Sequence, residues 1–209
     1  MFINRTEAGK KIAQKLETLR DKDAIVVALP RGGVVVGYQV ARAFSLPLDI
    51  IATRKIGHPS NPEYAIGAVD EHGTAVFNEA EVALVDERWL EEEVKKQKNE
   101  ARRRTKIYRK NKKQSTLIGK IAIIVDDGIA TGFTMRLAVK AVKKENPKKI
   151  IIAVPVAPPE SINEIKSEGA DEIIVLEPLN EFLGAVGAHY QEFEQVSDRD
   201  VIKLLQLSL

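Results

Sequence analysis

The chain has 209 residues, of which 44% are hydrophobic and 30% are charged, and its formal net charge is +2. This length suffices for one α/β domain with a full core, and the near-neutral charge is typical neither of a nucleic-acid-binding protein nor of a disordered tail. Because the sequence contains no cysteine, disulfides, thiolate zinc sites and a thiol nucleophile are excluded. No apolar run approaches the roughly twenty residues of a membrane span, and the N-terminus lacks a signal-peptide core. We therefore expect a cytoplasmic protein, outside the membrane, with a single domain over residues 1–209.

The first part of the chain predicts a strand-turn-helix corner. The elements expected here are an amphipathic packing helix, a buried strand and a second helix, at residues 6–20, 24–29 and 34–44. Between strand and second helix lies the turn Pro30-Arg31-Gly32-Gly33. Its glycines let the backbone approach an anion closely, its arginine adds a fixed positive charge, and the helix N-terminus adds its dipole. The spacing matches neither G-x-G-x-x-G nor a P-loop, so the turn does not indicate a dinucleotide site.

A third apolar run, residues 48–53, predicts another strand, and Arg54 and Lys55 stand at its end. These two cations would lie at the carboxyl edge of the sheet, where open α/β sheets bind ligands. Residues 56–64 are rich in Gly, Pro, Asn and Ser, whereas residues 65–77 alternate in polarity around a turn. We therefore expect a loop followed by a two-stranded ribbon.

Residues 86–113 are unusually charged. They hold twelve basic and six acidic side chains, so they carry a net charge of +6 against −4 for the rest of the chain. The acids crowd the start and the bases crowd the end, which suits a helix macrodipole and predicts one long exposed helix. Trp89, Leu90 and Val94 begin a narrow apolar stripe that could rest on the body of the protein or on another subunit. The basic end could meet nucleic acid, but such a run is more often a solvated face, and attraction of a polyanionic substrate explains the charge equally well.

The segment from Ile121 to Met135 joins a buried-type strand, two carboxylates, a glycine-spaced turn and the start of a helix. Asp126 and Asp127 follow the strand, where they can meet sugar hydroxyls or a hydrated divalent cation. In the turn, backbone N–H groups converge on one point beside threonine hydroxyls and a helix N-terminus, which suits a phosphate monoester. The phosphate-binding residues expected in this turn are Gly128, Ile129, Ala130, Thr131, Gly132 and Thr134.

The rest of the chain completes an alternation of strands and helices that predicts a doubly wound parallel sheet. Further elements are expected at residues 149–156 (strand), 160–168 (helix), 171–176 (strand) and 197–205 (capped helix). Residues 177–196 show no clean period. Three aromatic side chains lie there, and such residues most often pack within the protein. They are Phe182, Tyr190 and Phe193.

The loop at residues 121–135 resembles the PRPP-binding loop of the type I phosphoribosyltransferases, in which two acids and a Thr-Gly-x-Thr turn follow a buried strand. The Arg31-Gly32-Gly33 turn is similar to the pyrophosphate loop of that family, which often contains a non-proline cis peptide. Gly128 departs from the pattern, because family members often carry a branched apolar residue there. The resemblance implies an α/β fold of the type I phosphoribosyltransferase kind, with a doubly wound parallel sheet, a flexible β-ribbon, a helical insertion at residues 86–113 and a small hood at residues 177–196.

By position, the resemblance also implies roles for individual residues. Asp126 and Asp127 would hold the ribose hydroxyls of PRPP and, through water, Mg²⁺. Gly128 to Thr134 would hold the 5′-phosphate, and the hood aromatics would meet the acceptor. The pyrophosphate would be held by Arg31, Gly32, Gly33, Arg54 and Lys55. The candidates for catalytic residues are Asp127, which could assist a proton transfer, and Lys55.

The implied function is transfer of a 5-phosphoribosyl group from Mg²⁺-PRPP to a nitrogenous base or amine, with release of pyrophosphate. The expected partners are PRPP, the acceptor and further copies of the chain, such as in a dimer, but not nucleic acid. Two alternatives remain open: a PRPP- or nucleotide-sensing regulator that binds nucleic acid through the basic helix, and an oligomeric scaffold that dimerises through the same helix. No pattern in residues 177–196 identifies the acceptor.

Overall fold

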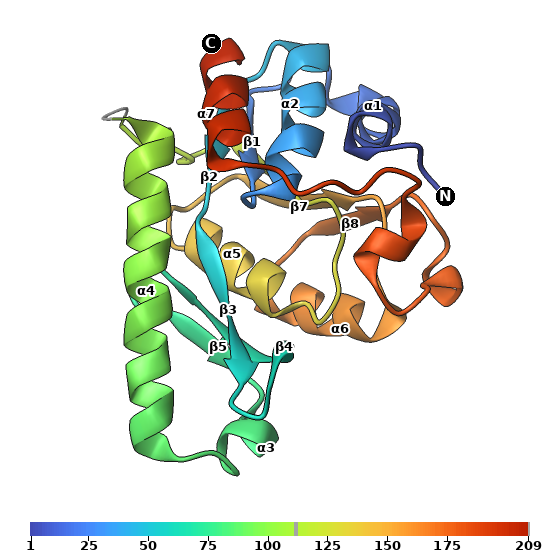
Figure 1. Ribbon diagram of the computed structural model, residues 1–209. Coiled ribbons are helices and arrows are strands. Elements are labelled where there is room, and N and C mark those ends of the chain that lie inside the picture. The colour runs from blue at the N-terminus through green and yellow to red at the C-terminus, as the bar shows by residue number, and fades with distance from the viewer. Residues whose placement is uncertain (111–112, 209) are drawn as a thin grey trace.

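The computed structural model describes residues 1–110 and 113–208 and contains two β-sheets (Figure 1). The larger has five parallel strands in the order β2-β1-β6-β7-β8. Its strands are β1 (Ala24–Ala28), β2 (Leu48–Ile50), β6 (Ile121–Val125), β7 (Lys149–Val154) and β8 (Glu172–Val175). The three central strands are aliphatic throughout because both of their faces are covered. The predicted doubly wound parallel sheet is confirmed.

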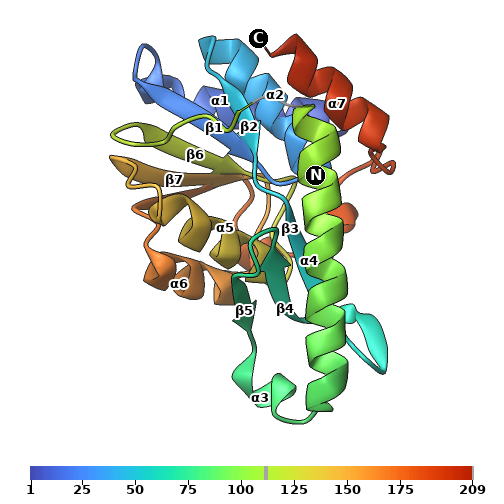
Figure 2. The same ribbon diagram turned by 90° about the vertical axis from the view of Figure 1, so that its left-hand side faces the viewer.

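Side chains of the central strands alternate between two apolar layers. Val26 and Ile123 pack with α1 (Arg5–Lys15), α2 (Gly32–Phe44) and α7 (Asp198–Leu207). Val27 and Ile124 pack with the helices of the other layer, α5 (Phe133–Lys143) and α6 (Pro159–Glu168). Figure 2 shows the two helical layers on opposite sides of the sheet. Since Ala28 of β1 pairs with Val125 of β6, the loops that follow these two strands leave the sheet side by side.

The segment expected to form a loop and a ribbon is a three-stranded antiparallel sheet. Its strands are β3 (Thr53–His58), β4 (Asn61–Asp70) and β5 (Ala75–Phe77), in that order. The prediction of one strand over residues 48–53 is wrong, because the chain leaves the larger sheet after Ile50. The prediction of a loop at residues 56–64 is also wrong, because most of these residues belong to β3 and β4. Gly57 marks a bulge within β3. The pairing of β3 with β4 shifts there, and a Cβ on Gly57 would lie 2.2 Å from the Pro62 carbonyl oxygen.

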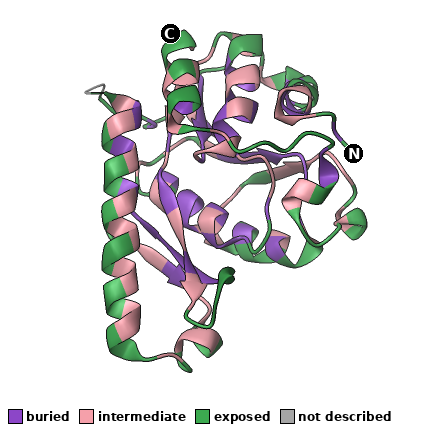
Figure 3. Cartoon of the chain, in the orientation of Figure 1, coloured by how far each residue is buried: buried purple, intermediate pink, exposed green. Residues whose placement is uncertain are grey.

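The short α3 (Glu79–Val82) follows the smaller sheet. The charged segment forms the long α4 (Glu87–Arg109), which stands along that sheet (Figure 1). The apolar stripe of α4 rests on the body of the protein. The side chains in this contact are Trp89, Leu90 and Val94 of α4 and Ile56, Ile66 and Val69 of the sheet. The helix is therefore exposed on one face and covered on the other, not exposed throughout (Figure 3). Lys110 ends the helix in a left-handed conformation, and residues 111–112 of the predicted helix lie outside the described residues.

The hood consists of two 3₁₀ turns, Leu179–Glu181 and Val186–His189, tied to the beginning of the chain. The tie is a bridge between Phe2 and Tyr190, in which the Phe2 N–H donates to the His189 carbonyl at 2.7 Å. The opening helix ends at Lys15 rather than at residue 20, since a 3₁₀ turn follows it. Among the helices of the two described ranges, none combines the length and apolar character that crossing a bilayer requires.

Candidate functional site

The arginine-glycine turn after β1 packs directly against the acidic pair after β6. A Cβ on Gly32 would lie 1.8 Å from Asp127 Oδ2, and a Cβ on Gly33 would lie 2.9 Å from Asp126 Cα. The peptide bond that enters this turn, between Pro30 and Arg31, is cis. Glycine is required at position 33 because a Cβ would meet the backbone of the other loop, and glycine at position 32 leaves room for the Asp127 carboxylate. Two segments far apart in the sequence thus form one continuous edge of the protein.

The turn after the acidic pair presents unpaired backbone donors. The N–H groups of residues 130–134 donate to no acceptor in the described part of the chain. Gly132, with a φ of 81°, precedes the first turn of α5 and turns the chain into the helix. Ala130 and Thr131 are exposed beside it. Adjacent amides at a helix N-terminus form an anion-binding site, so the geometry accommodates a phosphate here.

Ile129 differs from its neighbours in this turn. Its N–H donates to the Val156 carbonyl oxygen at 2.9 Å, and its side chain is buried in the layer under α5. The amide is therefore engaged and is not available to a phosphate, contrary to the prediction. Ile129 instead fixes the turn to the end of β7.

The departure at Gly128 has a packing cause. A Cβ on Gly128 would lie 2.5 Å from a methyl group of Val186 and 2.7 Å from one of Val156. Val186 belongs to the hood, so the hood fills the space where a branched side chain would stand at position 128.

The acidic pair lies in a half-buried place with one strong cationic partner. Asp126 Oδ1 accepts a hydrogen bond from the Asp127 N–H at 2.8 Å. Burial of the Asp126 carboxyl raises its pKa well above the usual value, and the negative charge of Asp127 adds to this. Asp127 Oδ2 accepts a hydrogen bond from Arg5 Nε at 2.6 Å, and the two side chains are only 16% and 11% exposed. Arg5, the first residue of α1, thus forms part of the site.

Arg5 also joins the acids to the hood. Its Nη1 donates to the Glu194 carbonyl at 2.7 Å, and its guanidinium lies 3.8 Å from the centroid of the Phe193 ring. Tyr190 stacks on Phe193 at 5.0 Å and donates its hydroxyl to the Asp127 carbonyl at 2.6 Å. Burial, followed by the charge of Asp127, raises the pKa of Tyr190. The sequence carried no signal for Arg5, because the opening helix shows only an ordinary amphipathic pattern.

The predicted acceptor aromatics therefore separate into two groups. Tyr190 and Phe193 lie at the acidic pair through their contacts with Asp127 and Arg5. Phe182 stacks instead on His189, with ring centroids 5.4 Å apart. His189 is buried, its Nε2 accepts the Leu183 N–H at 3.0 Å and its Nδ1 contacts the Glu177 carboxylate. Phe182 thus packs on a polar contact inside the hood.

The predicted cations lie on β3 rather than at the end of a strand of the larger sheet. The Nε of Arg54 donates to Gln97 Oε1 of α4 at 3.0 Å. Lys55 stands on the opposite face of β3, since it pairs with Ala68, which packs toward α5. Its Nζ lies 2.7 Å from Glu63 Oε2, and the side chain is 42% exposed. Arg54 therefore lies near Arg31, whereas Lys55 lies on the other face of β3.

Known proteins resemble this chain in sequence and in fold. The family model "Phosphoribosyl transferase domain" matches residues 4–190. Two Mycobacterium tuberculosis proteins, "Putative phosphoribosyl transferase MT0597" and "Putative phosphoribosyl transferase Rv0571c", are each 38% identical over 207 residues, which are 98% of this chain and 46% of theirs. The chain thus spans about half the length of these curated relatives.

Two solved structures share the fold. TT1426 from Thermus thermophilus is 39% identical, with a TM-score of 0.78 over 98% of this chain and 97% of that one. The AQ2163 protein from Aquifex aeolicus is 15% identical, with a TM-score of 0.52 over 82% of this chain and 72% of that one. With a family model that covers most of its length, this chain belongs to the phosphoribosyl transferase family, a family of pentosyltransferases.

Proposed function

We propose that the protein transfers the 5-phosphoribosyl group of Mg²⁺-PRPP to a nitrogenous base or amine and releases pyrophosphate. One observation carries the proposal: the free amides at residues 130–134, the acidic pair and the arginine-glycine turn lie along one edge of the sheet. Their order follows the order of the chemical groups in PRPP, which are the 5′-phosphate, the ribose and the pyrophosphate.

Each part of this edge has a defined task. The amides bind the 5′-phosphate, Asp126 and Asp127 accept hydrogen bonds from the ribose hydroxyls, and Arg31 and Arg54 bind the pyrophosphate. The C1–O bond breaks and pyrophosphate leaves with the bonding electrons, while the acceptor nitrogen forms the new bond to C1 and gives up a proton, for which Asp127 is the candidate base. Positive charge develops on the sugar, so catalysis rests on electrostatic stabilisation and on exact placement of the acceptor. The ion pair with Arg5 holds the Asp127 carboxylate in place.

The acidic pair also fits a magnesium ion. Carboxylate oxygens are the ligands that this cation prefers, and Asp126 and Asp127 would hold it through water. Burial, and then the negative charge of Asp127, raises the pKa of Asp126, and a divalent cation would stabilise its carboxylate form. When bound, the ion would supply charge neutralisation at the pyrophosphate.

For the acceptor we propose a contact with the exposed part of Phe193, whose ring already packs against the Arg5 guanidinium and the Tyr190 ring. Phe193 is 38% exposed, whereas Tyr190 is buried and Phe182 packs against His189. Tyr190 then holds Phe193 in place by stacking on its ring.

The structure offers little to the two alternatives. The three consecutive arginines of the basic helix do not form one open face: Arg102 donates to the Glu71 carbonyl at 2.8 Å, Arg103 donates to Glu100 at 2.7 Å, and the Arg104 side chain is only 13% exposed. The apolar stripe that could have paired with another subunit is covered by the smaller sheet. A homo-oligomer through some other surface remains part of the proposal, and light scattering would test it.

The experiment is a pyrophosphate-release assay with Mg²⁺, PRPP and a panel of bases and amines. We expect release with at least one acceptor, and losses of about a hundredfold or more in Asp126→Asn and Asp127→Asn, as for removal of other charge-stabilising groups. The matched control is Asp23→Asn, whose carboxylate is 71% exposed and pairs with Lys120 at the surface. A wild-type protein that neither releases pyrophosphate nor binds PRPP in calorimetry would refute the proposal.

A further inference from the structure

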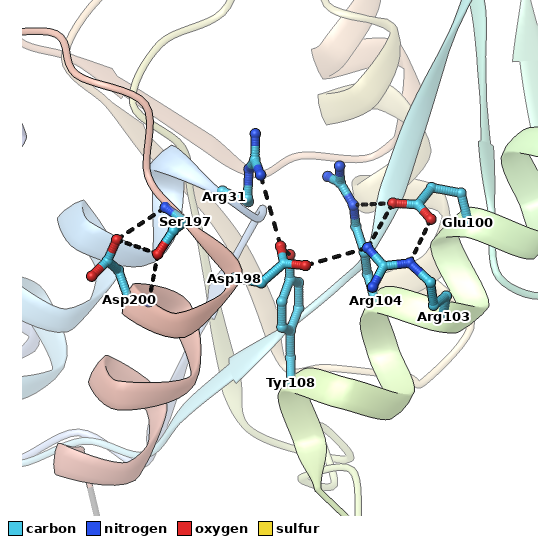
Figure 4. A network of polar contacts seen from close by, with 8 residues as sticks. All are labelled: Arg31, Glu100, Arg103, Arg104, Tyr108, Ser197, Asp198 and Asp200. Atoms are coloured by element: carbon cyan, nitrogen blue, oxygen red, sulfur yellow. Dashed lines mark hydrogen bonds and ion pairs between the residues drawn. The ribbon is translucent and has the colours of Figure 1, made fainter.

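Three arginines from three separate elements meet beside the arginine-glycine turn. They are Arg31 at the start of α2, Arg54 of β3 and Arg104 of α4, and we call them the arginine cluster. Asp198, the first residue of α7, lies among them: its Oδ1 is 3.8 Å from Arg31 Nη1 and accepts a hydrogen bond from the Tyr108 hydroxyl at 2.6 Å. Figure 4 shows the Arg31 and Arg104 side chains on either side of Asp198, with both guanidinium groups extending away from it in the same direction.

The cluster has more positive than negative charge. Arg54 is partly buried, and in the described part of the chain its side chain donates to one acceptor only, the neutral Gln97 Oε1. Burial lowers the pKa of Arg54, and the positive charge of Arg104 lowers it further. Buried charges are ordinarily paired, because an unpaired one loses its hydration without compensation. An anionic ligand would compensate this charge.

The carboxylates nearby are already shared. Glu100 accepts hydrogen bonds from Arg103 at 2.7 Å and from Arg104 at 2.9 Å, and Asp198 accepts from Arg103 at 3.3 Å as well as from Tyr108. Hydrogen bonds from Arg103 and then Arg104 lower the pKa of Glu100 to about 2 in spite of partial burial. A third carboxylate, Glu93, also lies near Arg54, but it is shared with Lys96 at 3.0 Å. Counting Arg103, four arginines thus face three shared carboxylates, so the acids do not fully offset the charge of the cluster.

We infer that Arg104 of α4 binds the pyrophosphate end of the substrate together with Arg31 and Arg54, and that Asp198 is an internal counter-ion that competes with it. The inference rests on the proposed function, because the anion is the pyrophosphate of PRPP. Arginine presents a planar fork of N–H groups that matches phosphate oxygens, and the cluster stands next to the Gly32-Gly33 turn, where the backbone can approach the same anion. The long helix α4 is then a wall of the substrate site rather than an outer face for another macromolecule.

The test measures binding of inorganic pyrophosphate to the full chain by calorimetry with Mg²⁺ present. Arg104→Gln removes a charged donor to a charged ligand and is expected to weaken binding at least about tenfold. Arg102→Gln is the matched control, since it removes the same charge from the same helix, but its Nε contacts the Glu71 carbonyl. It should stay within about twofold of wild type, because exposed charges act weakly at a distance. Equal losses in both variants, or none in Arg104→Gln, would overturn the assignment.

Two further variants keep the test sharp. Arg104→Lys keeps the charge but loses the fork, and we expect weaker binding than in wild type even if Arg104→Gln does not fold; unchanged binding in Arg104→Lys overturns the assignment. Asp198→Asn keeps the shape of the side chain, and the capping box of Ser197 and Asp200 still begins α7. It should tighten pyrophosphate binding several-fold, and no gain would refute the counter-ion.

Failure of the inference is distinct from failure of the proposed function. If wild type binds PRPP and Arg104→Gln binds it equally well, only the inference fails. If wild type binds neither PRPP nor pyrophosphate, both fail.

Discussion

Substitution of Arg5 tests whether its ion pair with Asp127 stabilises the site. The chain also contains an exposed ion pair, between Arg20 and Glu17, that serves as a control. Arg5→Gln removes a cation whose Nε lies 2.6 Å from Asp127 Oδ2, with the two side chains 11% and 16% exposed. The same substitution at Arg20 removes a pair of the same 2.6 Å length with Glu17, but those side chains are 54% and 59% exposed. The two ion pairs therefore differ mainly in burial, although Arg5→Gln also removes contacts with the Glu194 carbonyl and the Phe193 ring, which the double-mutant cycle below separates from the pair.

The expected magnitudes differ accordingly. Removing one partner of a buried pair costs about 3–5 kcal/mol, and the slight exposure here places Arg5→Gln at roughly 3 kcal/mol. Solvent screens an exposed pair, so Arg20→Gln should change stability much less than Arg5→Gln. For a chain of this size, about 1 kcal/mol shifts the unfolding temperature by roughly 2–4 °C. Thermal unfolding should therefore show a fall of about 6–12 °C in Arg5→Gln and a much smaller one in Arg20→Gln.

A double-mutant cycle isolates the pair itself. Combined with Asp127→Asn, the substitution of Arg5 should cost little more than either change alone, with a coupling energy of about 1–3 kcal/mol. If the two single effects simply add, or if Arg5→Gln is no more damaging than Arg20→Gln, then the ion pair does not stabilise the site and the reasoning is wrong.

Two other predictions concern the hood and the arginine contacts. Gly128→Ala should lower stability by about 1–3 kcal/mol, because its Cβ would meet Val186 in a filled space; adding Val186→Ala should recover part of this in thermal unfolding, and a purely additive loss would contradict the packing account. The pKa of Glu100 is lowered from 4.5 to about 2, chiefly by Arg103. Its stabilisation is thus complete above pH 4.5 and is lost as the pH falls through about 2. Glu100→Gln should remove about 1–2 kcal/mol of that pH dependence, since Arg103 is half exposed and solvent screens the contact. Urea unfolding at several pH values measures it, and a slope unchanged by the substitution would contradict the assignment.

The parts of the site that lie within one short stretch of sequence were predictable. Asp126 and Asp127, with the turn after them, and Arg31-Gly32-Gly33 each join a strand end to a helix start, and local residue types determine such corners. Arg5, Arg104 and Asp198 were not predictable, because an ion pair between distant segments leaves no periodic pattern in either segment. The strand β3 was not predicted because Gly57 interrupts the residue pattern of a strand. The cause of this glycine is also a contact outside its own strand, since the carbonyl group of Pro62 on the partner strand occupies the space of a side chain.

Gly33 has a consequence for how relatives of this protein are interpreted. A Cβ there would lie 2.9 Å from Asp126 Cα and 3.0 Å from the Val125 carbonyl oxygen, which are backbone atoms whether or not the protein catalyses a reaction. A descendant that had lost its activity but kept its shape would still need glycine at this position. The glycine is therefore a marker of the scaffold, and a comparison aimed at finding inactive members should examine the charged positions beside it, above all Arg31 and Asp126.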